Sequence, residues 1–526
     1  MNKNNLPIYF SIAVIFGIFI GIFFNNGKHY SSITKRTSSN EQKIRRLIEY
    51  IQSDYVDTVN TDQLLDNAIA EMLDKLDPHS VYIPKENLQS VTENMQGNFV
   101  GIGIQFRMKG DTITVVDAIK GGPSIKVGIK AGDRILMSDN DTLYGKKIKS
   151  SEILKKLKGK PNTKVNLQIY RKTNDSLFNI DITRGKVNIK SVDIAYMLTK
   201  NIGYIKVNRF ARNTYREFKT SLDTLLTKGM ETLVLDLRNN GGGFIDIANK
   251  LVDEFLEDDK LIVYTKNNKG AINKSFATNR GSFENGKLYV LIDENSASAS
   301  EIVAGAIQDN DKGTIIGRRS FGKGLVQQEM DLGDGSAIRL TTARYYTPTG
   351  RSIQKPYKKN KKSSNYREDI ENRFYNGELF NKDSIKTTDS LQFKTPEGKI
   401  VYGGGGIIPD VFVPIDTTSN ISTFIFIPLQ NFAFDYVDNN RATLNTLSID
   451  EFIETFDSNH KISKLFFSKI KDFKLSNKSK SKIKNSLKTV IARDLFNDEG
   501  LYKLSEKDDK MIQKVLKLEK QTKNLP

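Results

Sequence analysis

Hydrophobic and polar positions change their spacing several times along the chain, and each change predicts a different kind of element. Apolar residues recur at helical spacing over residues 44–51 and 64–76, which predicts two amphipathic helices. The second helix is expected to end at Asp77-Pro78, because the residue before a proline is pushed out of helical geometry. Between residues 97 and 184 the apolar runs become short and are separated by turn residues, as in β-strands. Strands are expected over 99–106, 112–116 and 164–170, with a short helix over 123–127.

After residue 186, apolar strands and amphipathic helices alternate. Strands are expected over residues 202–207, 232–237 and 287–292, and helices over 215–226, 245–255 and 298–308. This alternation predicts an α/β core with parallel strands. A β-hairpin is expected from Gly317 to Tyr346, turning at residues 333–336, and the polar stretch 355–395 is expected to be an inserted loop. Beyond about residue 416 the chain is predicted to be helical.

The N-terminal segment has the pattern of a membrane span. Residues 6–24 carry no charge and are rich in Ile and Phe, and 19 residues are about enough to cross a hydrocarbon core. No small-x-small cleavage pattern follows, so an uncleaved signal anchor is favoured over a removed signal peptide. Basic residues flank the segment on both sides, which weakens the inference of its orientation. We expect a single-pass protein of the bacterial inner membrane whose larger part is outside the cytoplasm.

Composition excludes several kinds of chemistry. The chain has no Cys and only three His, at positions 29, 79 and 460, which argues against thiol nucleophiles, disulfides and zinc sites. No metal and no cofactor are therefore expected. The net charge is +18, and residues 461–526 hold 18 basic against 8 acidic residues, so the surplus is concentrated in the tail. No nucleic-acid-binding motif accompanies this charge, and a solvated lysine-rich face is the simpler interpretation.

A cluster of serines follows a buried strand, at Asn295-Ser296-Ala297-Ser298-Ala299-Ser300-Glu301. A serine at this strand-to-helix junction would lie beside a helix N-terminus, where backbone N–H groups stabilise an oxyanion. Serine is also a preferred N-cap residue, so a purely structural role is the alternative. A nucleophilic serine needs a base, and histidine is scarce in this chain.

Lys323 is a candidate base, because it stands between Gly322 and Gly324 after an apolar strand. Burial lowers the pKa of a lysine and leaves a neutral amine that accepts protons. Gln327, four residues on, is placed to hold that amine by a hydrogen bond. The alternative is a surface lysine in a glycine turn.

Taken together, these segments resemble the C-terminal processing (tail-specific) serine peptidases. Further matching motifs occur in the family's order over roughly residues 40–415. They are Asp77-Pro78-His79-Ser80-Val81-Tyr82, Gly101-Ile102-Gly103-Ile104, Ala131-Gly132-Asp133-Arg134-Ile135, Asp236-Leu237-Arg238-Asn239-Asn240-Gly241-Gly242-Gly243, Thr347-Pro348-Thr349-Gly350-Arg351-Ser352-Ile353 and Gly405-Gly406-Ile407-Ile408-Pro409-Asp410.

The resemblance implies a site and a fold. The family's nucleophile falls on Ser298 and its lysine on Lys323, 25 residues later, with Gln327 as the residue that orients the lysine. The oxyanion hole is implied to use Ala299 N–H and a glycine N–H, with Gly242 and Gly243 both open as the donor. The implied fold is a multidomain α/β protein with a crotonase-like peptidase core, an inserted PDZ β-domain, N-terminal helices and a helical C-terminal extension. His79 is expected to be structural.

The PDZ resemblance implies how substrate is recognised. Such domains add a peptide strand to a sheet edge and capture its terminal carboxylate in a backbone nest, here Gly101, Ile102, Gly103 and Ile104. Alternatively, the glycines only permit close packing of strands. Protein substrates with apolar C-terminal tails are the expected partners, together with the membrane, and a homo-oligomer is compatible with the sequence. The expected parts are residues 1–30 (anchor), 31–96 (linker and helices), 97–184 (PDZ), 185–415 (peptidase core) and 416–526 (basic helical extension).

Three other functions fit the sequence less well. A catalytically idle PDZ scaffold has no need of Ser298, Lys323 and Gln327 together. A trypsin-like PDZ protease requires a Gly-x-Ser-Gly-Gly motif and a histidine, and the sequence has no such pairing. A Ser-x-x-Lys site fails because Glu301 occupies the lysine position. For the triglycine, a phosphate loop lacks its Lys-Ser/Thr ending, while a simple turn stays open.

Overall fold

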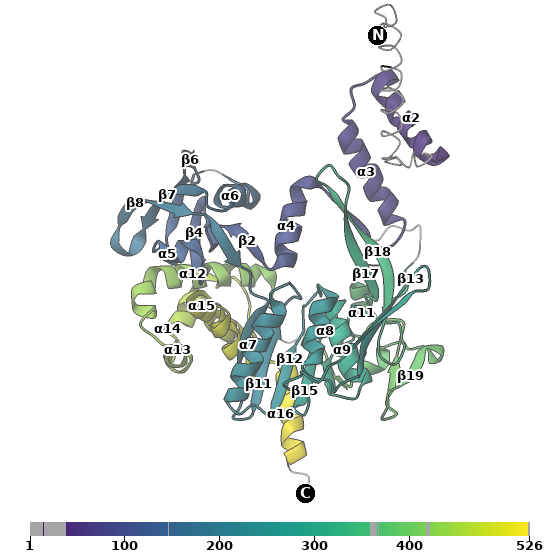
Figure 1. Cartoon of the computed structure of the whole chain (residues 1–526). Helices are drawn as coiled ribbons and strands as arrows, with labels where there is room; N and C mark the ends of the chain where they lie inside the picture. Colours follow the sequence, from purple (N-terminus) through teal and green to yellow (C-terminus); the bar gives the residue numbers. More distant parts are fainter. Residues whose placement is uncertain are drawn as a thin grey trace, which may run out of the picture. The chain divides into compact units, whose positions relative to one another are not determined.

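The computed structural model describes residue 14 and residues 38–145, 147–357, 366, 368–416 and 421–523 (Figure 1). The expected membrane segment, residues 6–24, lies outside the described residues apart from Val14. Within the described ranges, none of the helices is long and apolar enough to cross a membrane. The chain divides into two compact units, residues 1–71 and 72–526.

The two amphipathic helices predicted near the N-terminus are present. Helix α2 (Ser39–Asp54) begins at a capping box, in which Ser38 Oγ accepts from the Glu41 N–H and the Glu41 carboxylate accepts from the Ser38 N–H. Helix α3 (Thr61–Asp74) follows, and its Thr61 hydroxyl accepts a hydrogen bond from Gln52 at 3.2 Å.

A β-rich region follows β1 (Val81–Ile83) and α4 (Lys85–Gln96). Its main sheet has the order β3-β4-β5-β7-β8, with β6 (Asp141–Thr142) paired to β5, and two short helices, α5 (Pro123–Lys126) and α6 (Ser150–Leu157). The strands are β3 (Ile104–Lys109), β4 (Thr112–Ala118), β5 (Arg134–Ser138), β7 (Lys164–Arg171) and β8 (Ser176–Thr183). Strands β2 (Asn98–Gly101) and β9 (Gly185–Asn188), through which the chain enters and leaves, pair with each other. The single strand expected over 99–106 is instead two strands, because Gly103 has a φ of +79° that breaks the extended backbone.

A six-stranded sheet of order β10-β11-β12-β15-β16-β21 forms the α/β core. Its strands are β10 (Val192–Met197), β11 (Ile202–Val207), β12 (Thr232–Asp236), β15 (Lys287–Ile292), β16 (Thr314–Gly317) and β21 (Val411–Phe412). All pair in parallel except β10, which is antiparallel to β11, so the predicted parallel core is confirmed. The sequence prediction did not include β10.

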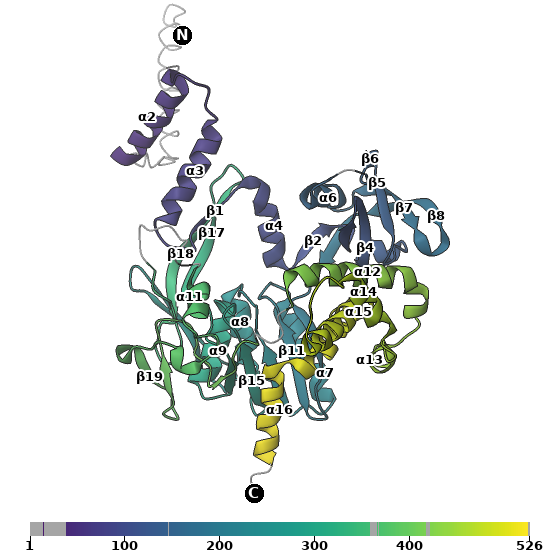
Figure 2. The ribbon, with the colours of Figure 1, turned by 180° about the vertical axis from the view of Figure 1, so that it is seen from behind.

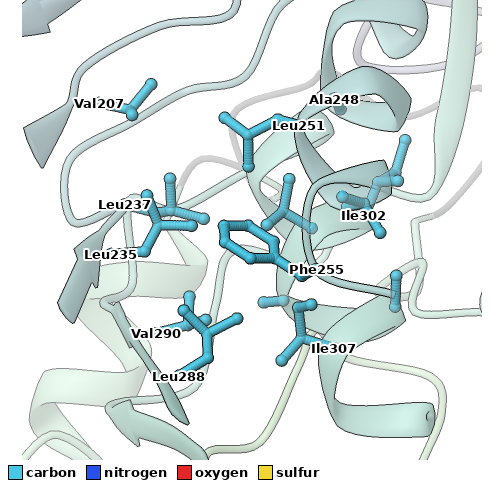
Figure 3. Close-up of a cluster of buried hydrophobic side chains, with 14 of the residues drawn as sticks. Val207, Leu235, Leu237, Ala248, Leu251, Phe255, Leu288, Val290, Ile302 and Ile307 are labelled. Carbon is cyan, nitrogen blue, oxygen red and sulfur yellow. The ribbon is translucent and has the colours of Figure 1, made fainter. Parts of the chain in front are cut away.

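Three helices pack on this sheet: α7 (Thr214–Thr227), α8 (Ile245–Asp253) and α9 (Ala299–Asp309). Figure 3 shows side chains of β12 and β15, such as Leu235 and Val290, facing Leu251 of α8 and Ile302 of α9. All 11 residues of α9 are buried, and the polar ones among them, such as Glu301 and Asp309, are buried together with the apolar ones. The start of α9 is thereby fixed against the carboxyl ends of the parallel strands.

A second sheet has the order β1-β18-β13-β14, and β17 also pairs with β18. Its strands include β13 (Leu261–Asn267), β14 (Ile272–Phe276), β17 (Leu325–Asp331) and β18 (Ala337–Tyr346). The predicted hairpin is therefore shorter than expected, because Gly317 ends β16 in the first sheet and residues 318–324 form an irregular segment before β17. The stretch 355–395, expected to be a loop, contains α11 (Asp369–Tyr375) and β19 (Gln392–Lys394), which pairs with β20 (Ile400–Tyr402).

The C-terminal region is helical, as predicted. It contains α12 (Thr423–Leu444), α13 (Ile449–Thr455), α14 (Lys461–Lys469), α15 (Asn477–Ser505) and α16 (Lys510–Lys523). Helices α12 and α15 lie side by side in both views and share an apolar cluster that includes Leu429, Phe452 and Ile491 (Figures 1 and 2). Helix α16 instead buries Met511 and Val515 against side chains of the central sheet.

Candidate active site

Ser298 lies where the buried strand β15 gives way to α9, as the N-cap of that helix. Its backbone has φ +57° and ψ −112°, a conformation that non-glycine residues rarely adopt and that costs about 1–3 kcal/mol. Such strain persists only where the surroundings fix the backbone. The junction therefore presents Ser298 at a sharp turn, as the sequence predicted.

The neighbouring serines are held differently from Ser298. Ser296 and Ser300 are fully buried, and their hydroxyls donate to the carbonyls of Leu237 (2.9 Å) and Asn240 (2.8 Å). Both therefore tie the junction to the loop after β12. Ser298 alone of the three is partly exposed.

The triglycine loop after β12 lies directly against Ser298. A Cβ on Gly242 would come within 2.8 Å of Ser298 Cβ and 2.9 Å of Ala299 N, and φ is +97°, so only glycine fits. The Gly242 N–H donates to Asn240 Oδ1 at 2.9 Å. For the N–H groups of Gly243 and Ala299, no acceptor is assigned within the described part of the chain. These two donors flank the serine.

Lys323 lies in the irregular segment 318–324 between β16 and β17. Burial lowers its pKa to about 8, helped by the charge of Arg339 and opposed by the charges of Glu301 and Asp77. The buried lysines Lys206 and Lys355 differ from Lys323 in having an ion-pair partner. Lys206 pairs with Asp236 and Lys355 with Asp369, each at 3.1 Å. Among the described residues, no carboxylate forms an ion pair with Lys323.

Glu301 joins the serine and the lysine through their backbones. Its carboxylate accepts hydrogen bonds from the N–H groups of Ser298 (2.8 Å), Gly322 (2.7 Å) and Lys323 (2.8 Å) and from the Ser320 hydroxyl (2.5 Å). The side chain is fully buried, and burial raises its pKa against the lowering effect of these bonds. From the sequence, Glu301 was expected only to exclude a Ser-x-x-Lys site. The missed signal was the capping-box spacing of Ser298 and Glu301.

Gln327 is not hydrogen-bonded to Lys323 in the contacts of the described residues. It lies on β17, and its Nε2 donates to Thr341 Oγ1 over a long 3.4 Å. The Thr341 hydroxyl in turn donates to Asp77 Oδ1 at 3.1 Å. The structure thus places Gln327 near the segment of the lysine but does not form the predicted contact.

His79 packs against the lysine segment through Phe321. Its Nε2 lies 3.0 Å from the Tyr366 hydroxyl, and its ring is edge-on to Tyr366 and near Phe321. Burial, followed by the charge of Lys323, lowers the pKa of His79 to about 3, although Asp77 opposes this effect. The imidazole is therefore neutral and held by an aromatic cluster, in keeping with a structural role.

The predicted carboxylate-binding residues lie at the start of β3. Gly101 ends β2, Gly103 has its positive φ, and Ile102 is buried at 2% exposure. The Ile102 and Gly103 carbonyls accept from Ser124 (2.8 Å) and Ile119 (2.9 Å), which fixes this turn. Among the described strands, β3 pairs only with β4, so it is an edge strand of its sheet.

Four parts of the chain match known families. Residues 201–360 match Peptidase family S41, residues 100–182 match the PDZ domain, and residues 24–87 match the activating protease CtpB N-terminal domain. Residues 428–497 match a family of unknown function, DUF8443.

Curated relatives cover most of the motif-bearing region. A probable CtpA-like serine protease of Staphylococcus aureus (strain N315) is 34% identical over 346 residues, 65% of this chain and 68% of the relative. A carboxy-terminal-processing protease of Bartonella bacilliformis is 37% identical over 330 residues, 60% of this chain and 75% of the relative. Among solved structures, the photosystem II D1 C-terminal processing protease is 25% identical with a TM-score of 0.37, covering 72% of this chain and 88% of that chain. The chain therefore belongs to the S41 family of serine peptidases, among the carboxy-terminal-processing proteases that carry a PDZ domain.

Proposed function

We propose that this peptidase binds the apolar C-terminal tail of a protein substrate through its PDZ domain and cleaves the substrate with Ser298 as nucleophile and Lys323 as general base. The observation that carries this proposal is the link through Glu301. One buried carboxylate holds the backbone of a strained, partly exposed serine and of a partly buried lysine that lacks an ion-pair partner among the described residues. A serine nucleophile is activated by a base that accepts its proton, and the neutral form of the Lys323 amine is proposed as that base.

The proposed reaction passes through an acyl-enzyme. Ser298 Oγ attacks the carbonyl carbon of the scissile peptide bond while its proton moves to Lys323 Nζ. The C–N bond then breaks, and the Lys323 ammonium gives that proton to the leaving amine. Water, deprotonated by the Lys323 amine, attacks the ester carbonyl carbon. The C–O bond to Ser298 then breaks, and the Lys323 ammonium returns the proton to Ser298 Oγ.

For the oxyanion hole, we favour the N–H groups of Ala299 and Gly243 over that of Gly242. The Gly242 N–H already donates to Asn240 Oδ1 at 2.9 Å, so it is not free for substrate. Ala299 is the first residue of α9, where the helix dipole adds to the stabilisation of a developing negative charge. Gly242 then serves by leaving room for Ser298.

Gln327 is proposed to orient the Lys323 amine in the substrate complex. Its 3.4 Å bond to Thr341 is long and hence easily exchanged. Catalytic hydrogen bonds in substrate-free enzymes are often long and shorten only when substrate binds.

Membrane attachment completes the proposal. Residues 6–24 are uncharged and long enough to span a bilayer, so we propose that they anchor the peptidase with its catalytic part outside the cytoplasm. Substrates would then be membrane-associated or exported proteins with apolar tails.

The test compares the full chain with Ser298→Ala and Lys323→Ala, using one substrate with an apolar C-terminal tail and the same substrate with an amidated tail. Both variants are expected to lose at least about 10³-fold in kcat/KM. Lys312→Met is the matched control, because burial also lowers the pKa of Lys312 although its ammonium contacts the Glu284 and Gly286 carbonyls. Wild-type activity in either catalytic variant would overturn the dyad, and equal cleavage of both substrates would overturn tail recognition.

A further inference from the structure

Helix α12 of the C-terminal region lies against the PDZ domain through a set of charged and aromatic contacts. Asp438 is at their centre. It forms two hydrogen bonds with the Arg134 guanidinium, at 2.9 and 2.6 Å, and an ion pair with Lys172 at 3.3 Å. The Asp438 side chain is 2% exposed, so these cations replace its hydration. Burial alone would raise the pKa of Asp438, but the bond and charge of Arg134 bring it below its ordinary value.

Neighbouring residues of α12 extend the contact along β3. The Arg107 guanidinium lies over the ring of Phe434 at 4.3 Å, and Phe434 is 3% exposed. Lys109 pairs with Asp435 at 2.7 Å. Phe434, Asp435 and Asp438 occupy positions i, i+1 and i+4, so one side of the helix meets the domain.

This contact is made by side chains of β3 and not by its backbone edge, where a tail is proposed to bind. Side chains alternate along a strand, and Phe106 and Met108 pack on the PDZ core while Arg107 and Lys109 meet α12. The helix therefore covers a face of β3, whereas a peptide would pair with its backbone edge.

The opposite end of the same region is fixed to the peptidase core. The Tyr502 hydroxyl, on α15, donates to Asp193 at 3.0 Å, and the Tyr196 hydroxyl, on β10, donates to Glu506 at 2.7 Å. Arg238, which precedes the triglycine loop, pairs with Asp509 at 2.7 Å. The C-terminal region thus contacts both the PDZ domain and the segment that leads to Gly242.

From these two sets of contacts we infer that residues 423–510, which include the match of unknown function, act as a brace that holds the PDZ domain at a fixed place on the peptidase core. The backbone link between the two is otherwise the strand pair β2 and β9. Fixing the PDZ domain lowers the entropy lost when a bound tail delivers the scissile bond to Ser298. The delivery step rests on the proposed function, whereas the brace itself does not.

The test uses the full chain with Asp438→Asn and Phe434→Ala, and follows backbone hydrogen exchange in β3, β4 and β5 by mass spectrometry. Exchange there is expected to become about tenfold faster in either variant. For the tailed substrate, KM should rise about fivefold, while the affinity of a fluorescent tail peptide should change less than about twofold. Asp450→Asn is the matched control, since that carboxylate is exposed and lies 3.7 Å from Lys503 within the same region.

A double-mutant cycle distinguishes loss of the contact between Arg134 and Asp438 from general misfolding. Arg134→Gln with Asp438→Asn should be no worse than Asp438→Asn alone, because the two side chains form one contact. Unchanged exchange in β3–β5, or fully additive effects in the cycle, would overturn the brace. If the wild-type enzyme ignores the tail, tail recognition is wrong, and the exchange measurement still decides on the brace.

Discussion

Ser298 and Lys323 are held in different ways, although one reaction is proposed for both. Ser298 lies between the buried strand β15 and the buried helix α9, and its neighbours Ser296 and Ser300 bond to backbone carbonyls. Lys323 lies in an irregular segment, residues 318–324, between the strands β16 and β17. The position of the serine thus follows from regular structure next to it, whereas that of the lysine depends on distant side chains.

Two of the side chains that hold the lysine segment, Glu301 and Arg373, come from different parts of the chain. Glu301 binds the backbone of Gly322 and Lys323. From the 355–395 stretch, the Arg373 guanidinium donates to the carbonyls of Arg319 (3.2 Å), Ser320 (2.8 Å) and Phe321 (3.3 Å), and Arg373 is only 2% exposed. The proposed general base is therefore the more easily displaced half of the dyad.

Glu301→Ala should have the largest effect, because it removes the acceptor common to both halves. We expect kcat/KM to fall about 10²- to 10³-fold, since displacements near 1 Å have such costs, and the free energy of unfolding to fall by about 3 kcal/mol as buried donors lose their partner. Glu254→Ala is the matched control, because Glu254 is also buried and accepts from Tyr215 and Ser282. Equal losses of activity in the two variants would contradict a specific role of Glu301.

The pH dependence of kcat/KM should report the lysine alone. With the Lys323 pKa near 8, the neutral amine is the minor form below that pH and the major form above it. Lowering the pH from 9 to 6 should therefore reduce kcat/KM about 90-fold through a single acidic limb. Stopped assays of the tailed substrate across this range measure it. A limb centred near 6.5, the ordinary value of histidine, would contradict Lys323 as base.

Arg373→Gln should displace the lysine segment while leaving the serine in place. We expect kcat to fall about tenfold with little change in KM, and the acidic limb to move to higher pH because a better hydrated lysine has a higher pKa. Arg212→Gln serves as control, since that arginine forms an exposed pair with Asp246. If the acidic limb of the pH profile is unchanged while the melting temperature falls, Arg373 stabilises the fold but does not position Lys323.

The sequence allowed the serine half of the site to be predicted better than the lysine half. Strand and helix periodicity located β15 and α9, and hence the junction at Ser298, because buried elements leave a clear apolar pattern. The family resemblance then selected Ser298 and Lys323 among their neighbours. Periodicity also predicted the parallel core, although β10, β13 and β14 were missed.

Long-range polar contacts were not predictable in the same way. Arg373 lies in a polar stretch that was interpreted as a loop, because polar residues usually indicate exposure. A polar sequence does not reveal that the Arg373 guanidinium is buried against backbone carbonyls such as that of Ser320, 53 residues away. The four hydrogen bonds of Glu301 likewise join segments that only folding brings together. A local feature was missed as well, because the positive φ of Gly103 divides the strand expected over 99–106 into two.

Thr341→Val should have the smallest effect and sharpen the role of Gln327. Valine keeps the shape of threonine but removes the hydroxyl that accepts from Gln327 and donates to Asp77. If Gln327 turns to Lys323 in the substrate complex, kcat of Thr341→Val should stay within about twofold of wild type, with a loss of about 1 kcal/mol in the free energy of unfolding. Gln327→Ala should instead lower kcat about tenfold. Equal kcat losses in the two variants would mean that Gln327 acts through Thr341 and not on the amine, because only that route requires both side chains.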